Sequence, residues 1–126
     1  MARTALTPVV LTANAVVADP AGTALDATND HVFTAAYPTD EYVIRVVNTT
    51  ASTKTVQLKA GDNPPADAAG QGDLTLSLTA GDSTPTVKWF GPFTSSRFLQ
   101  NDGTVNIDVD GSMTGTITVF RIPRNA

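Results

Sequence analysis

The sequence predicts an all-β protein, an antiparallel β-sandwich or barrel of about seven to nine strands. Apolar and polar residues alternate with a period of two in several segments, whereas a helical period of 3.6 is hard to find. Threonine makes up about one residue in six, and threonine with valine favours strands. Asp-Gly and Gly-Asp pairs separate the alternating segments and suit tight turns. A jelly-roll or immunoglobulin-like arrangement is consistent with these observations.

The length of 126 residues is that of one compact domain. The chain contains neither an internal repeat nor a Pro- or Ser-rich linker, so we expect a single domain over residues 1–126, with residues 1–12 as a possible extended arm. The absence of cysteine excludes disulfides, zinc–thiolate sites and a cysteine nucleophile.

The net charge of −4 comes with lysines and arginines that are scattered along the chain. Because no basic cluster is present to neutralise phosphates, we expect no direct nucleic-acid binding. No segment reaches the roughly 20 apolar residues of a membrane helix, so no membrane association is expected. The first 20 residues also lack the apolar run of a signal peptide, which predicts synthesis and folding in the cytoplasm.

In the first half of the chain, residues 7–17 and 31–37 are weak strand candidates. Residues 41–48 are a stronger one, because both faces of the alternation are largely apolar, which indicates a central strand. One face carries Tyr42, Ile44 and Val46, and the other carries Val43, Arg45 and Val47. Residues 53–60 alternate apolar with polar side chains, as expected of a half-buried strand.

In the second half, residues 73–81 show the clearest alternation, with three leucines predicted to point inward. Residues 104–111 repeat this pattern with Val105, Ile107 and Val109. In residues 115–123, Ile117 and Val119 face one way and Phe120 the other. Residues 84–93 form a further strand candidate that carries several aromatic residues.

Residues 61–73, GDNPPADAAGQGD, are too poor in apolar side chains to enter a core. Pro64 and Pro65 favour an extended segment and remove backbone donors. The segment lacks the G-x-G-x-x-G and GK[ST] motifs of phosphate-binding loops, and its acidic residues lack calcium-loop spacing. We therefore expect a long irregular connection between two strands. In a sandwich, this connection could cross from one sheet to the other.

No set of residues has the pattern of a catalytic site. His31 is the only histidine, and its neighbour Asp30 would point to the opposite face of a strand. We expect His31 to lie on the surface at the start of a strand. Glu41, the only glutamate, follows Asp40 in a turn-like stretch and is expected to be a solvated strand entry. The sequence predicts no enzyme activity and no cofactor.

Residues 108–119 begin like a calcium-binding loop, with Asp108, Asp110 and Ser112 at the first, third and fifth positions. The twelfth position, where a bidentate glutamate is needed, holds Val119. A hairpin turn at residues 110–111 accounts better for the pattern, so no metal is expected.

An aromatic cluster lies around WFGPFTSSRF, residues 89–98. Trp89 and Phe90 are adjacent on a predicted strand, so they must point to opposite faces. One of them must contact a second sheet, a covering loop or a partner subunit. Aromatic and arginine side chains are common anchors of protein interfaces. The interface candidates are Trp89, Phe90, Phe93, Arg97, Pro64 and Pro65. Coverage by the loop 61–73 remains equally open.

Nearly the whole chain resembles small structural proteins that tailed bacteriophages encode among their head genes. The most telling pieces are KAGDNPPADAAGQGDL, GPFTSSRFLQNDGTVNIDVD and the FRIPR ending. Proteins of this kind are similar to capsid decoration, or cement, proteins. The resemblance implies a β-rich fold, no catalysis, frequent trimers, and binding to the major capsid protein at the junctions between capsomers on the virion surface.

These observations lead to one main expectation and two alternatives. The main expectation is a non-enzymatic virion protein, made in the host cytoplasm, that forms homo-oligomers, preferably trimers, and reinforces the capsid. The first alternative is a carbohydrate-binding β-sandwich in which an exposed aromatic such as Trp89 stacks on a sugar. The second is a structural subunit of the tail or of the head–tail connector.

Overall fold

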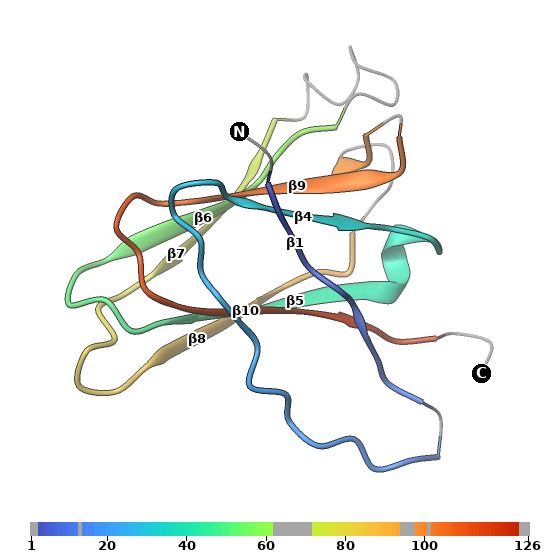
Figure 1. Ribbon diagram of the computed structural model, residues 1–126, viewed down its shortest axis with the longest axis horizontal. Helices are drawn as coiled ribbons and strands as arrows, with labels where there is room; N and C mark the ends of the chain where they lie inside the picture. The colour runs from blue at the N-terminus through green and yellow to red at the C-terminus, as the bar shows by residue number, and fades with distance from the viewer. Residues whose placement is uncertain (1–2, 13, 62–71, 94–97, 101, 124–126) are drawn as a thin grey trace.

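The protein is an all-β sandwich in which two sheets pack face to face, as the sequence predicts. The computed structural model describes residues 3–12, 14–61, 72–93, 98–100 and 102–123. Sheet A has the strand order β1-β4-β9-β6-β7, and sheet B has the order β2-β10-β5-β8, with β3 also paired to β10. Figure 1 shows β4, β6 and β9 in one layer and β5, β8 and β10 in the other.

The described residues form ten strands and one short 3-10 helix, η1 (Thr39–Glu41). Sheet A contains β1 (Thr4–Ala5), β4 (His31–Thr34), β6 (Lys54–Leu58), β7 (Leu74–Leu78) and β9 (Thr104–Val109). Sheet B contains β2 (Val9–Val10), β3 (Thr23–Ala24), β5 (Tyr42–Asn48), β8 (Thr86–Phe90) and β10 (Gly115–Arg121). The number of strands exceeds the expected seven to nine because it includes β1, β2 and β3, which contain only two residues each.

Strand pairing is antiparallel except where the N-terminal segment joins the sheets. β1 pairs with β4 and β2 pairs with β10 in parallel, while the other pairs are antiparallel. β5 lies between β10 and β8, which confirms that it is a central strand. The two sheets are therefore mixed, although their long strands form an antiparallel framework.

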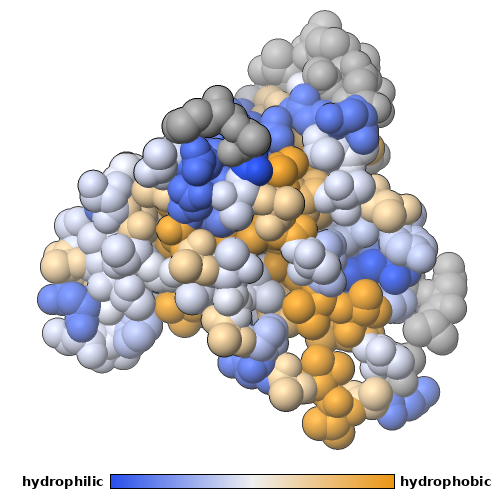
Figure 2. All heavy atoms as spheres, in the orientation of Figure 1, coloured by the Kyte–Doolittle hydropathy of each residue, from blue (hydrophilic) through white to orange (hydrophobic). Residues whose placement is uncertain are grey.

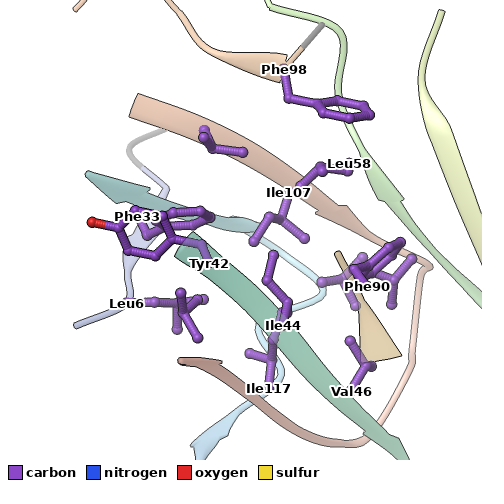
Figure 3. Close-up of a cluster of buried hydrophobic side chains, with 14 of the residues drawn as sticks. Leu6, Phe33, Tyr42, Ile44, Val46, Leu58, Phe90, Phe98, Ile107 and Ile117 are labelled. Atoms are coloured by element: carbon purple, nitrogen blue, oxygen red, sulfur yellow. The ribbon is translucent and has the colours of Figure 1, made fainter. Parts of the chain in front are cut away.

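The core lies between the sheets and follows the alternation seen in the sequence. Ile44 and Val46 from β5 and Ile107 from β9 are fully buried. In Figure 3, side chains from β5 and from β9 point toward one another across this space. β10 differs from the simple pattern, because Thr118 and Phe120 on its other face are buried as well. The Trp89 ring covers Phe120 on the outer face of sheet B, and the chain at Gly22 lies against Thr118.

Residues 3–11 close one edge of the sandwich. The backbone N–H of Thr4 donates to Asp30 in sheet A, and that of Leu11 donates to Arg121 in sheet B. Between them, Leu6 is buried in the core. The expectation of an arm over residues 1–12 is thus modified: its described part is extended but pairs with the edge strands of its own chain.

Two connections differ from the sequence-based expectation. β6 and β7 are antiparallel neighbours within sheet A, so residues 59–73 connect strands of one sheet rather than crossing between sheets. Conversely, the turn at Asp110–Gly111 is not a hairpin, because β9 belongs to sheet A and β10 to sheet B. The turn itself is present, since the carbonyl of Asp110 accepts a hydrogen bond from the N–H of Met113.

Candidate functional site

The structure divides the aromatic cluster between the two sides of sheet B. Phe90 and Phe93 are 3% and 5% exposed and pack in the core, whereas Trp89 is 55% exposed on the outer face. The opposed directions predicted for Trp89 and Phe90 are confirmed. Burial removes Phe90 and Phe93 as interface residues, because a partner cannot reach them. Arg97, Pro64 and Pro65 lie outside the described residues.

Trp89 extends across the outer surface of sheet B. Its ring centroid lies 5.5 Å from that of Phe120, with an angle of 32° between the rings. β5 lies between the strands that carry these two residues, so the indole must reach over β5 to meet Phe120. This contact helps to bury Phe120 on the outer face, while more than half of the Trp89 surface remains open to solvent.

Arg45 lies beside this aromatic pair and holds a neighbouring segment of the chain. Its guanidinium carbon is 6.0 Å from the ring centroid of Trp89 and 5.6 Å from that of Phe120. The guanidinium pairs with the carboxylate of Asp19 and donates to the carbonyl of Pro20 at 2.9 Å. Arg45 is therefore an anchor for the segment at residues 19–20, and cation–π attraction adds to this role.

The outer face of sheet B is rich in apolar side chains, and we call this group the Trp89 face. It consists of Val43, Val47, Val87, Trp89 and Phe120, which the strand register places on one side of the sheet. Val87 is 47% exposed, so it adds open apolar area next to Trp89. An exposed aromatic ring within such a group is typical of a contact surface.

The outer face of sheet A is polar by contrast. Its register places Thr34, Gln57, Thr104, Asn106 and Asp108 on that side. The carboxylate of Asp108 pairs with Arg3 at 2.6 Å and with Lys59 at 3.7 Å. Lys59 also pairs with Asp73 at 2.7 Å, and this contact raises the pKa of the Lys59 amine. Such a face is well suited to water.

A second group of exposed apolar residues lies around β2 and the segment that follows it. Val10, Val16, Val17 and Ile122 are at least 40% exposed, and Val16 is fully exposed. Figure 2 shows orange surface in the lower right of the view, where Figure 1 places β2 and the segment leading to β3. This group extends the apolar character of sheet B beyond the Trp89 face.

The expected surface position of His31 is wrong, since the side chain is fully buried in sheet A. Its Nε2 accepts a hydrogen bond from the N–H of Asp26 at 3.0 Å. The ring proton therefore lies on Nδ1, which donates to the carbonyl of Thr4 at 3.3 Å. His31 thus connects β1 to the turn at residue 26.

The stability of the protein is expected to fall as the pH drops below about 6.5, the ordinary pKa of histidine. Burial lowers the pKa of folded His31, because the charged ring would lose its hydration. Protonation would also place a second N–H against the N–H of Asp26. The unfolded chain therefore takes up this proton first, and the loss is at most about 1.4 kcal/mol per pH unit. Urea unfolding at pH 7.5, 6.5 and 5.5 measures it.

Two carboxylates, those of Asp26 and Asp30, act electrostatically on His31. The hydrogen bond from Thr4, with those from Asn29, lowers the pKa of Asp26 to about 2, so the Asp26 carboxylate stays ionised between pH 7.5 and 5.5. The carboxylate of Asp30 accepts a hydrogen bond from the N–H of Val109. A His31→Gln variant removes the proton uptake and should show a flatter pH dependence. Equal pH dependence in both proteins would contradict this assignment.

Glu41 is also buried rather than solvated. Its carboxylate pairs with the guanidinium of Arg121 at 3.2 Å, and the backbone carbonyl accepts from Ile122. Arg121 in turn lies 3.4 Å from the ring centroid of Tyr37. These contacts attach η1 to the end of β10. Each charge compensates the other, so the pair connects η1 to β10 without leaving a buried charge unpaired.

The acidic residues near the turn at 110–111 are engaged by neighbouring groups. The carboxylate of Asp110 accepts hydrogen bonds from the N–H and hydroxyl of Thr55, and that of Asp30 accepts from the N–H of Val109 at 2.7 Å. An open hollow of about 320 Å³ lies between them and Asp108. Within the described residues, no three acidic or histidine side chains are grouped to hold a metal ion.

Comparisons of this chain with protein-family models, with curated proteins and with solved structures found no match. Among the described residues, there is no helix with the length and apolar character needed to span a membrane.

The sequence identified Trp89 but missed its neighbours. Phe120 and Arg45 had a visible signal, because alternation assigns both to the side of a strand opposite to the core residues. Asp19 had none, since its contact with Arg45 joins residues that are 26 positions apart. The hydrophobic Trp89 face could thus be predicted in part, and the segment that Arg45 holds beside it could not.

Proposed function

We propose that this protein is a non-enzymatic structural component of a tailed-phage virion that decorates the outside of the capsid. The observation that carries the proposal is the difference between its two outer faces. A decorating protein needs one surface for the shell and another for water. The Trp89 face has the apolar composition of a surface that binds the shell. The outer face of sheet A has the polar composition of a surface that faces water.

The proposed role is to reinforce the shell at the junctions between capsomers. A protein that binds only the assembled shell stabilises it by mass action. Several weak contacts on the same particle strengthen one another through effective concentration. The partner is the major capsid protein, and the sequence resemblance favours a homo-oligomer, preferably a trimer. This role needs no catalytic residue, metal or cofactor.

Purified protein mixed with undecorated capsids of the phage that encodes it should bind saturably. Co-sedimentation measures the stoichiometry, and light scattering during heating measures the disruption temperature of the particles. We expect decorated capsids to break at a higher temperature than bare ones. Absence of binding to both expanded and unexpanded heads would contradict the proposal. Saturable binding to tails or connectors instead of heads would favour the alternative structural role.

A carbohydrate-binding module is a second candidate because of one specific arrangement. The exposed ring of Trp89 lies near Arg45, whose partner Asp19 has a carboxylate that is 78% exposed. An aromatic platform beside an acidic acceptor can stack on a sugar and bind its hydroxyl groups. Trp89 is the only tryptophan, so its fluorescence reports this site alone. Binding on a glycan array with a fluorescence change would favour this candidate, and no response to any sugar would remove it.

A further inference from the structure

The edges of the two sheets are protected in different ways. An edge strand exposes backbone N–H and C=O groups that can pair with another chain. β1, β2 and β3 are only two residues long, which leaves little edge to pair with. β8 carries Lys88, which the register places on the same side as buried Phe90 although it is itself exposed. An inward charge of this kind discourages strand addition.

β7 has none of these protections. It is five residues long and reads Leu-Thr-Leu-Ser-Leu, with no charged residue and no proline. One side pairs with β6, and among the described residues no strand pairs with the other side. Leu74 and Leu76 are only partly buried, whereas Leu78 is completely buried. The strand therefore offers both open backbone groups and apolar area that a further strand would cover.

We propose that β7 is a self-association edge, on which β7 of a second copy adds in the antiparallel direction. The occupant is a second copy because the strand is complementary to itself. Antiparallel pairing centred on Leu76 places Leu74 opposite Leu78 and Thr75 opposite Ser77 of the second copy. The contact brings together no like charges, although each chain has a net charge of −4.

Such pairing would join the two A sheets into one continuous sheet around a two-fold axis. The contact is isologous, since the same strand contributes from both copies. It leaves the Trp89 face on sheet B outside the pairing. The inference does not depend on capsid binding. The two-fold pair also differs from the trimer that the sequence resemblance favours, so a measurement of the oligomeric state distinguishes the dimer from the trimer.

The test compares the wild type with a Thr75→Lys/Ser77→Lys double variant. Both side chains are exposed, so the fold should tolerate the changes, and circular dichroism checks this. In the proposed pair, each new lysine would face a lysine of the other copy and repel it. A Thr12→Lys/Thr34→Lys variant is the matched control, because it adds the same charge at exposed residues outside β7 and the connections that flank it.

Sedimentation velocity between 5 and 500 µM should show a monomer–dimer equilibrium for the wild type and for the control. The double variant should weaken dimer formation at least tenfold. Hydrogen exchange should show that amides of β7, and not those of β8, become more protected as the concentration rises. A wild type that stays monomeric, a trimer that is unaffected by the β7 variant, or concentration-independent exchange in β7 would overturn the proposal.

Discussion

Replacement of Asn48 by alanine is expected to lower the free energy of unfolding by about 3 kcal/mol. Asn48 is completely buried at the end of β5. Its amide nitrogen donates to the carbonyls of Thr79 at 2.9 Å, Ser52 at 3.3 Å and Leu78 at 3.4 Å. Because Leu78 belongs to sheet A, these bonds join the two layers. Removal of the amide breaks all three contacts, of which the one to Leu78 is fully buried, and leaves a cavity at the end of β5.

The neighbouring Thr49→Ala variant is the control for this prediction. Thr49 is exposed and its hydroxyl lies 3.0 Å from that of Thr114, so its loss should cost no more than about 0.5 kcal/mol. Urea unfolding followed by far-UV circular dichroism measures both variants. If Asn48→Ala were no less stable than Thr49→Ala, the amide would not hold the sheets together.

Replacement of Trp89 by alanine is expected to weaken capsid binding about 30-fold or more, the effect of a typical interface hot spot. The exposed indole is the largest open apolar side chain of the Trp89 face. The change also removes the ring above Phe120, so a moderate loss of stability is expected alongside the loss of binding. Co-sedimentation with undecorated capsids, at a temperature where both proteins are folded, measures the affinity.

Two further variants separate binding from folding. Trp89→Phe keeps an aromatic ring over Phe120 and should retain much of the affinity. Gln57→Ala alters the polar outer face of sheet A and should bind like the wild type. The proposed orientation would be contradicted if Gln57→Ala bound as poorly as Trp89→Ala, or if Trp89→Ala bound normally.

Local alternation was sufficient to predict the longer strands and the inward residues of β5, β7 and β9, but not the two-residue strands β1 and β3. It also assigned Trp89 and Phe90 to opposite faces, because that depends only on the geometry of one strand. Local alternation could not predict which distant segments pair with one another. β1 adds to the sheet beside His31, and Arg121 reaches Glu41 from 80 residues away. These long-range contacts bury two groups that appear solvated in sequence.

The same distinction applies to the candidate site. Sequence reasoning selected a mixed group of aromatic residues, and burial then removed Phe90 and Phe93 from it. The sequence could not show that Arg45 would hold the segment at residues 19–20 over sheet B. Nor could the sequence show which strands lie at the edges of the sheets, since that depends on the order of the strands in each sheet.

The orientation of the protein on the virion tests the central claim most directly. A cryo-electron microscopy reconstruction of intact heads can distinguish the two faces of the sandwich. We predict density for this protein on the outside of the shell, with sheet B and Trp89 against the capsid and the polar face of sheet A toward solvent. Density with sheet A against the shell, or located only in the tail, would contradict the account.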